Sequence, residues 1–390
     1  MFKKTLLASS VFAAIAAIPA VANESSADDK YGHDLYGVIA VQLANRDYKE
    51  DNKNSGFQIN NETRLGWRGH ARFDSLPEHT KFIWQVETGY VDPSFSNRSG
   101  SYFGERDTFV GFDSERFGLV RAGRVLTPLY ELVDWPGSNP GLGDVWDWGG
   151  TIGGVKHNDR QSDTIRWDTM ELWTGFTLDL AAGAGNDRSD STGSEKSKNN
   201  YWHGGAAHQR FDLGSGNWIQ LDLAYEMNYN TRSVAKQVGA DDDDPGITNY
   251  WDNKAWLVGV QGGLGPVGYF AQYRRAEAET EEANSSTVKE KQDSYTTGLM
   301  YNFGANNKWQ AKVAYAKNNE LKVGSTKQNN TDDKVWSAQL LYQVDSNAVV
   351  YARYRDVKMG DAYKMRASDV DPRWKSDSFK EASVGIEYWF

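Results

Sequence analysis

Residues 57–73 read FQINNETRLGWRGHARF and alternate between apolar and polar side chains. The apolar set is Phe57, Ile59, Leu65, Trp67, Ala71 and Phe73. The polar set is Gln58, Asn60, Glu62, Arg64, Arg68, His70 and Arg72. A period of two is typical of a β-strand with one apolar and one polar face. Strands of soluble proteins usually have about five or six residues, so a strand of this length favours a tall, tilted barrel wall.

The same alternation returns throughout the chain, in the stretches 82–90, 219–229, 294–303, 336–344 and 384–390. Aromatic residues lie near the ends of these stretches, as in the girdles of outer-membrane barrels. The opposite face carries Arg, Glu, Asp and Gln, which suits a water-filled lumen. The alternative is a soluble β-sandwich, in which the apolar face would pack on a second sheet.

Turn residues define the number of strands. Seven short turns are predicted, at 75–79, 113–116, 170–173, 212–216, 263–266, 304–307 and 345–347. Eight long polar connections alternate with them, at about 46–56, 92–101, 125–160, 186–199, 230–250, 277–291, 318–333 and 359–377. Together they join sixteen strands, a number wide enough to leave an aqueous channel. The sequence therefore predicts an all-β, 16-stranded antiparallel transmembrane β-barrel, with both termini on the periplasmic side.

The connection at about 125–160 differs from the others because it is rich in Gly, Pro, Trp and Asp. A loop of this length is usually functional or disordered, and disordered segments are poor in aromatic residues. We therefore expect an ordered loop that folds inward and narrows the bore. Its candidate lining residues are Tyr130, Glu131, Asp134, Asp144 and Asp147.

Three tryptophans of this loop, Trp135, Trp146 and Trp148, support two hypotheses. Their rings could stack against sugar rings, which would make a saccharide-selective channel. Alternatively, they pack the loop against the barrel wall with one end exposed to water.

The N-terminus has the three parts of a secretory signal: Lys3 and Lys4, an apolar run over residues 6–18, and the small-residue site Ala20–Ala22. We predict a cleaved signal peptide over residues 1–22 and a single barrel domain over 23–390. A membrane anchor is the alternative, but the apolar run is too short to span a bilayer.

Composition excludes several classes of function. The whole chain has 43 basic and 53 acidic residues, and the predicted signal removes two bases, so the mature charge is −12. An acidic chain is a poor nucleic-acid binder and favours cations in a pore that it lines. Without cysteine there is no thiolate chemistry or disulfide scaffold. The acidic run 241–244 predicts a solvated loop or a contact with divalent-bridged lipopolysaccharide, rather than a Ca²⁺ site.

Catalytic motifs are missing from the sequence: there is no His-Glu-x-x-His spacing and no Gly-x-Ser-x-Gly elbow. We therefore predict neither an enzyme nor a cofactor or metal site. An outer-membrane barrel enzyme is a remote alternative.

Several stretches resemble the general porins of Gram-negative outer membranes. Residues 63–69, TRLGWRG, look like the family's second-strand signature, and 106–112, RDTFVGF, are similar to its fourth strand. Residues 117–124, FGLVRAGR, followed by 127–130, TPLY, look like its fifth strand entering the constriction loop. The C-terminal Phe390 looks like the residue by which the barrel assembly machinery recognises such proteins.

The resemblance implies a homotrimer in the outer membrane, in which the third extracellular loop folds inward opposite a basic wall. By position, Arg64, Arg106 and Arg124 match that wall, and Arg68 shares the parity of Arg64. Porin loops often carry a Pro-Glu-Phe-Gly segment at the tip, whereas this chain has PGLG at 140–143. Which of the nearby acids replaces that Glu stays open at this point.

The predicted function is a porin: a water-filled outer-membrane channel for passive diffusion of ions and small hydrophilic solutes, leaning towards cations. The alternative is a channel selective for oligosaccharides.

Overall fold

A computed structural model of the chain describes residues 30–49, 55–89, 103–138, 141–148, 157, 159–184, 201–235, 247–281, 287–360 and 378–390. The predicted signal sequence and the acidic run at 241–244 lie outside these residues. The first half of the described chain contains β1 (Tyr31–Tyr48), β2 (Gly56–Asn61), β3 (Arg64–Ala71), β4 (Thr80–Thr88), β5 (Phe103–Ser114), β6 (Gly118–Leu126), α2 (Pro128–Leu132), η1 (Val133–Ser138), α3 (Val145–Trp148), β7 (Arg160–Asp168), β8 (Phe176–Ala184) and β9 (Tyr201–Gly214). The second half contains β10 (Asn217–Ala235), β11 (Ile247–Leu264), β12 (Val267–Glu281), β13 (Thr287–Phe303), η2 (Ala305–Asn307), β14 (Trp309–Asn318), β15 (Lys322–Val323), β16 (Thr326–Lys327), β17 (Asp333–Asp345), β18 (Ala348–Lys358) and β19 (Phe379–Trp389). Of the helices in this part of the chain, none has the length and apolar character needed to cross a membrane.

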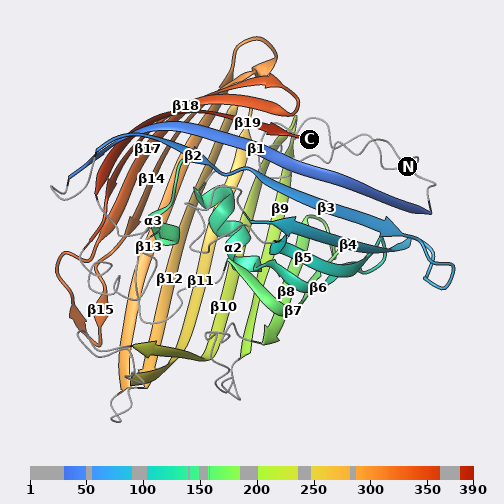
Figure 1. Cartoon of the computed structure of the whole chain (residues 1–390), viewed down its shortest axis with the longest axis horizontal. Helices are drawn as coiled ribbons and strands as arrows, with labels where there is room; N and C mark the ends of the chain where they lie inside the picture. The colour runs from blue at the N-terminus through green and yellow to red at the C-terminus, as the bar shows by residue number, and fades with distance from the viewer. Residues whose placement is uncertain are drawn as a thin grey trace.

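The strands close into one antiparallel barrel (Figure 1). Closure is made between the ends of the chain, because β1 pairs with β19 from Val38↔Trp389 to Tyr48↔Phe379. Of the nineteen strand segments in the described residues, β2 and β3 are two parts of one wall strand, and β15 and β16 form a small hairpin within a connection. Sixteen wall strands remain, which confirms the predicted fold class.

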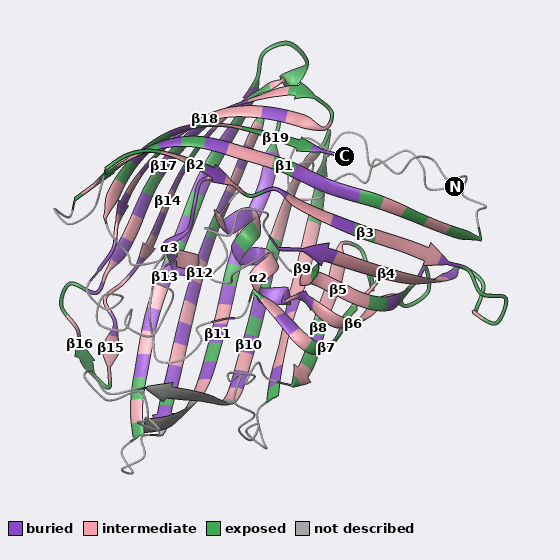
Figure 2. Cartoon of the chain, in the orientation of Figure 1, coloured by how far each residue is buried: buried purple, intermediate pink, exposed green. Residues whose placement is uncertain are grey.

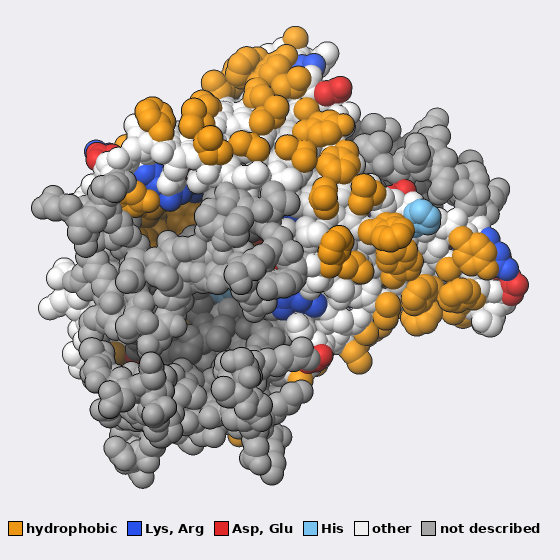
Figure 3. Space-filling model, viewed as in Figure 1, with side chains coloured by type: hydrophobic (Ala, Val, Ile, Leu, Met, Phe, Trp, Pro, Cys, Tyr) orange, Lys and Arg blue, Asp and Glu red, His pale blue; other side chains and the backbone are white. Residues whose placement is uncertain are grey.

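Apolar side chains cover the outside of the barrel. On β10, Leu221 and Leu223 are exposed, whereas Asp222 between them is only 3% exposed. The same alternation runs along the other wall strands (Figure 2). Figure 3 shows apolar side chains gathered over the outer surface of the wall. An apolar exterior and a polar interior are the arrangement that a lipid environment requires of a barrel.

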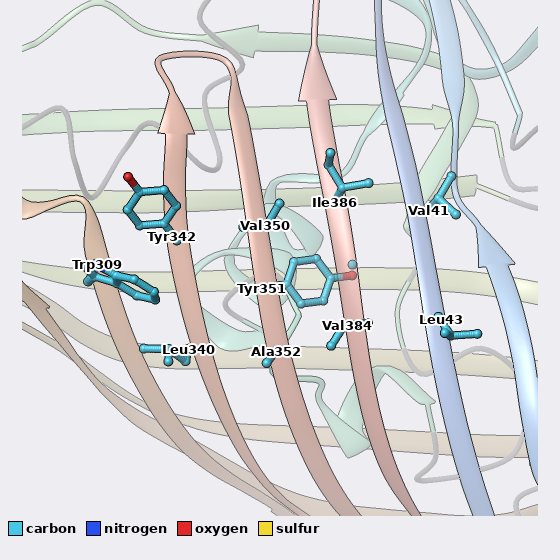
Figure 4. Close-up of a pocket in the computed structure, with 11 residues that line it drawn as sticks. Val41, Leu43, Trp309, Leu340, Tyr342, Val350, Tyr351, Ala352, Val384 and Ile386 are labelled. Atoms are coloured by element: carbon cyan, nitrogen blue, oxygen red, sulfur yellow. The ribbon is translucent and has the colours of Figure 1, made fainter.

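One apolar groove lies on this outer surface, across β1, β14, β17, β18 and β19 (Figure 4). Its lining includes Leu43, Leu340, Val384 and Ile386, all of which are more than two-fifths exposed. Exposed apolar side chains of this kind are typical of a barrel surface that is covered by lipid or by another barrel.

All seven predicted short turns join consecutive wall strands. One of the two-residue turns is Ser215–Gly216 between β9 and β10, where both residues have positive φ, of 54° and 79°. Two successive positive φ angles are the requirement of a type I′ hairpin turn, for which glycine is favoured. The strand ends that lead into the long connections therefore lie at the opposite end of the barrel.

The wall strand predicted from residues 57–73 is interrupted at Glu62 and Thr63. The Glu62 N–H still donates to the Ala40 carbonyl at 2.9 Å. Side chains make the other bonds there: the Thr63 hydroxyl accepts from the Ala40 N–H at 3.1 Å, and the Asn61 side-chain oxygen accepts from the Thr63 N–H at 3.0 Å. The register against β1 is the same on both sides of the break. The predicted alternation is therefore correct, although the strand is not continuous.

Simple alternation from Arg106 would place Asp107 on the outward face, but its environment in the structure is different. Its side chain is 14% exposed and accepts a hydrogen bond from Arg160 Nε at 2.6 Å. The cause is a register shift in the β4–β5 pairing, between Val86 and Thr88, which breaks the alternation before Thr108.

Several strands extend further than the sequence predicted, so the connections at 230–250 and 277–291 are shorter than expected. The β12–β13 ladder continues from Arg275↔Asp293 to Glu281↔Thr287. Ion pairs cross this extension, such as Lys289–Glu279 at 3.2 Å. Polar strand ends of this kind look like loops in the sequence because they lack apolar alternation.

Candidate functional site

The segment after β6 begins with a short helix that its own sequence specifies. The Thr127 hydroxyl caps α2 by accepting from the Tyr130 N–H at 3.1 Å, and Pro128 follows at the first helical position. Both are favourable choices at a helix N-terminus. Helical geometry then breaks at Trp135 in η1 (φ −138°, ψ 125°), immediately before Pro136. A residue before proline is biased towards extended geometry, so the chain turns here.

The helix α2 packs on the face of the wall opposite the exposed apolar side chains (Figure 1). Its buried residues Leu129 and Leu132, with Val133 at the start of η1, form one cluster with small wall residues. These are Ala206, Ala224, Ala255, Ala276 and Ala278. Alanine at these positions leaves room for the helix backbone to approach the strands. The Gln272 side chain on β12 also donates to the Leu132 carbonyl at 2.9 Å.

The segment from 141 onward is held by a buried ion pair. Asp144 and Arg274 pair with both side chains fully buried. The other Asp144 oxygen accepts from the Trp146 N–H at 2.9 Å and so begins α3. Asn318 on β14 donates to the Val145 carbonyl at 2.7 Å. Asp144 therefore anchors the segment, and its carboxylate is not exposed to solvent.

A second ion pair holds α2. Arg166 on β7 donates to both Glu131 oxygens, at 2.8 and 2.7 Å. Arg166 also bonds Asp168 at 2.6 Å and the Leu126 carbonyl at 2.8 Å. Burial raises the pKa of Glu131, and the Arg166 guanidinium opposes that rise. Arg166 was not among the predicted site residues.

The predicted basic residues lie on neighbouring wall strands around Glu87. Arg64 Nε lies 4.0 Å from a Glu87 oxygen, and Arg106 bonds the same carboxylate. The Tyr36 hydroxyl donates to Glu87 at 2.8 Å, and the Arg68 guanidinium lies 4.7 Å from the Tyr36 ring centre. The structure thus brings Arg64, Arg68 and Arg106 together. Arg124 instead donates to the Glu105 carbonyl at 2.6 Å and to Ser162 at 3.2 Å.

Asp134 is the exposed acid of the segment, and the charges that act on it come from this arginine-rich wall. Enclosure by protein raises the pKa of Asp134, and Arg106, Arg160 and Arg64 oppose that rise. The Asp134 residue is exposed to solvent, unlike its buried neighbours Leu132 and Val133. A carboxylate and several guanidiniums therefore act on one another in this part of the barrel, and charges of opposite sign at short range can order ions and water.

The three tryptophans have different environments. Trp146 is 1% exposed and stacks on His157 with ring centres 6.0 Å apart. Trp148 packs against Val145 and its neighbours, and the Arg355 guanidinium lies 5.0 Å from its ring centre. Trp135 is half-buried and has no hydrogen bond or ring contact among the described residues. Of the three tryptophans, Trp135 is therefore the one whose ring has no partner among the described residues.

The remaining loop candidates are less exposed than Asp134. The Tyr130 ring lies 5.7 Å from the His157 ring and packs against the buried cluster of α2. Asp147 is in α3 and is partly exposed. Within the described ranges, no group of three or more His, Cys, Asp or Glu side chains is arranged to hold a metal ion.

The sequence reasoning missed Arg160, Arg166 and Arg274, which hold or face the loop acids. Alternation within β7 would have placed Arg166 on the polar face, because Ile165 and Trp167 on either side are exposed. Nothing local in β12 identifies Arg274 as the partner of Asp144, since the two lie 130 residues apart.

Comparison with known proteins agrees with this geometry. The family described as Gram-negative porin matches residues 8–362. A chitoporin of Vibrio furnissii is 32% identical over 405 residues, which cover the whole of this chain and 99% of that protein. Among solved structures, an anion-selective porin from Comamonas acidovorans has a TM-score of 0.64 at 19% identity, covering 92% of this chain and 100% of the other. A loop L8 deletion mutant of OmpT, an outer membrane protein of Vibrio cholerae, has a TM-score of 0.65 at 15% identity, covering 93% and 100%.

The barrel is closed, apolar outside and polar inside. Together with these matches, this architecture defines an outer-membrane channel. The chain belongs to the Gram-negative porin family.

Proposed function

We propose that this porin conducts ions and small hydrophilic solutes by passive diffusion, through a lumen narrowed by the loop at about 125–160. The observation that carries the proposal is that Asp134, an exposed acid of this loop, is under the electrostatic influence of Arg106, Arg160 and Arg64. The packing of α2 and α3 against the inner wall supports a loop that stays inside the barrel. The mature charge of −12, after removal of the predicted signal peptide, supports a preference for cations.

The test is the zero-current potential of the purified protein in a planar bilayer under a salt gradient. We expect cation preference in the wild type and a shift towards anions in Asp134→Asn, because the variant removes the exposed loop charge. Asp345→Asn, in an exposed turn at the far end of the barrel, is the matched control and should leave the potential unchanged. Anion preference in the wild type would contradict the proposed preference for cations.

A second candidate function is a preference for chitin oligosaccharides. Two observations favour it: the relative that is 32% identical is a chitoporin, and Trp135 presents a free ring beside Asp134. Aromatic rings bind apolar faces of ligands while polar neighbours fix their orientation. Arg64 and Arg106 on the facing wall supply donors for sugar hydroxyls.

Single-channel recording separates the two candidates. A chitin-selective channel shows brief blocks by chito-oligosaccharides that malto-oligosaccharides of equal length do not produce. Trp135→Ala should then shorten the blocks, and Trp135→Phe should retain them in part. Trp173→Ala is the control. Trp173 is 58% exposed and stacks on Phe176 in the short turn between β7 and β8, at the end of the barrel opposite the long connections. Equal responses to both sugars would support a general diffusion porin.

Assembly as a homotrimer is part of the same proposal. A structure of OmpT from Vibrio cholerae, with a TM-score of 0.59, is described as a trimer form. The C-terminal Phe390 pairs with Gly37 of β1, so the last residue takes part in closing the barrel. We propose that the assembly machinery recognises this residue. Chemical cross-linking in native membranes tests the trimer, and a monomer at all cross-linker concentrations would contradict it.

A further inference from the structure

Three polar side chains form a row on the inner face of the wall, on strands β14, β17 and β18. Lys312 is directly opposite Gln339, which in turn is directly opposite Arg353. These residues are 1%, 5% and 9% exposed. The next residue along each strand is instead exposed on the outer surface: Val313, Leu340 and Tyr354. The three side chains therefore point to the interior of the barrel, and we call them the buried row.

The tip of the loop between β6 and β7 packs on this row. A β-carbon at Gly141 would lie 2.5 Å from the Gln339 side-chain nitrogen and 3.2 Å from a guanidinium nitrogen of the row. The next residue, Leu142, belongs to one apolar cluster with Met300. Met300 is directly opposite Lys312 on strand β13. The loop tip therefore encloses the row, and a ligand held between the two has to be small.

Two hydrogen-bond donors of the row lack acceptors. Lys312 Nζ and Arg353 Nε are enclosed by protein, and neither has a hydrogen-bond partner among the described residues. Arg353 bonds Glu381 at 3.2 Å, but through another guanidinium nitrogen, Nη2. Lysine is almost never fully buried unless it is paired, because a buried charge without a partner is costly. The row therefore requires an acceptor that the described side chains do not supply.

The charges around the row leave a positive surplus. Three guanidiniums share the carboxylate of Glu381: those of Arg46, Arg353 and Arg355. Glu387 acts on Lys312 electrostatically, without a hydrogen bond between them. Glu62 and Arg64 also act on Glu387, and their charges cancel. Four bases therefore face two acids, and the surplus of positive charge favours an anion as the missing acceptor.

We propose that the buried row binds one small inorganic anion, a halide, beneath the loop tip. Backbones two strands apart in a sheet are separated by about 10 Å, so the long side chains of Lys312 and Arg353 reach a common anion from both sides of Gln339. Lys312 Nζ and Arg353 Nε donate to it, and hydrogen bonds between charged groups are strong. The bound halide stabilises the loop tip against the wall. The inference rests on the packing of the tip and not on which solutes the channel conducts.

The direct test is X-ray diffraction from crystals of the protein grown with bromide in place of chloride, recorded at the bromine absorption edge. We expect an anomalous peak within hydrogen-bond distance of Lys312 Nζ and Arg353 Nε. Lys312→Met should lose the peak, because methionine is of similar length and has no charge. Lys308→Met, in the turn before β14, is the matched control and should keep it. The proposal is overturned if the wild type has no peak at the row, or if the peak persists in Lys312→Met.

Single-channel recording gives a second, independent measurement in the membrane. When chloride is replaced by gluconate at equal ionic strength, the loop tip of the wild type should lose its anion. Brief closures should then become about tenfold more frequent, the factor by which a ligand at ten times its dissociation constant favours the bound state. Lys312→Met should give the same closure frequency in both salts, and a cooperative thermal unfolding transition shows that this variant is folded. Equal frequencies in chloride and gluconate for the wild type would contradict the proposal.

Discussion

The carboxylate of Asp144 and the guanidinium of Arg274 form an ion pair in which both side chains are completely buried. The pair joins the loop between β6 and β7 to strand β12 on the far wall, 130 residues later in the chain. Gln272 accepts from Arg274 Nε at 3.1 Å and donates to the Leu132 carbonyl, so the same site also fixes the end of α2.

Removing Asp144 should destabilise the protein. Asp144→Ala leaves the Arg274 charge buried without a partner, and breaking a buried pair in this way costs about 3–5 kcal/mol. We expect a lower midpoint of thermal unfolding in detergent and noisier single-channel currents. In the double variant Asp144→Leu/Arg274→Met the loss of stability should be much smaller, because no unpaired charge is left. Equal losses in single and double variants would show that the pair does not anchor the loop.

The ion selectivity of the channel should change with pH through Asp134. Enclosure raises the pKa of Asp134, with Arg106, Arg160 and Arg64 opposing. The carboxylate therefore takes up a proton at a higher pH than an ordinary aspartate, and its negative charge is lost as the pH falls. Cation preference should fall on acidification in the wild type, whereas Asp134→Asn should lack this part of the change. If the wild type and Asp134→Asn gave the same dependence of the zero-current potential on pH, this role for Asp134 would be ruled out.

The loop tip also depends on an apolar contact. Leu142 is 0% exposed and packs against Phe270, Met300 and Ala314, in a socket where the Phe270 ring lies over Gly298. Leu142→Ala should cost about 2–5 kcal/mol as a large-to-small change in a buried site. We expect frequent conductance fluctuations as the tip leaves its socket. Leu340→Ala, on the outer surface, should leave the current record unchanged.

Glu381 on β19 is the centre of a charge cluster in the wall. It accepts from Arg46 at 2.7 Å, Arg353 at 3.2 Å and Arg355 at 2.6 Å, and its side chain is 0% exposed. Glu381→Gln leaves three guanidiniums without their common anion. Unfolding should therefore occur at a lower temperature in the variant. High salt should recover part of the lost unfolding temperature, because it screens the repulsion among the three guanidiniums. An unchanged unfolding temperature at low salt would contradict this account.

Where sequence reasoning failed, the failures have local causes. Alternation alone assigns Asp107 to the wrong face, because it does not reveal the register shift beside this residue. The polar ends of β12 and β13 resemble loops in the sequence, because cross-strand ion pairs such as Lys289–Glu279 join them instead of apolar alternation. Trp146 proved to be a buried packing residue with 1% exposure, an outcome that was one of the two alternatives for the loop tryptophans.

The sequence by itself determined the barrel. Side chains alternate between the two faces of a strand whatever surrounds it, so the apolar and polar sets of residues 57–73 specify outside and inside without further information. Turn residues such as Ser215 and Gly216 act equally locally, and they set the number of strands. Only the tertiary structure decided the partners of the loop: Glu131 with Arg166, Asp144 with Arg274, and Asp134 left facing the arginines. The physical reason is that these charges lie far apart in the chain, and pairing depends on which side chains the closed barrel brings within hydrogen-bond distance.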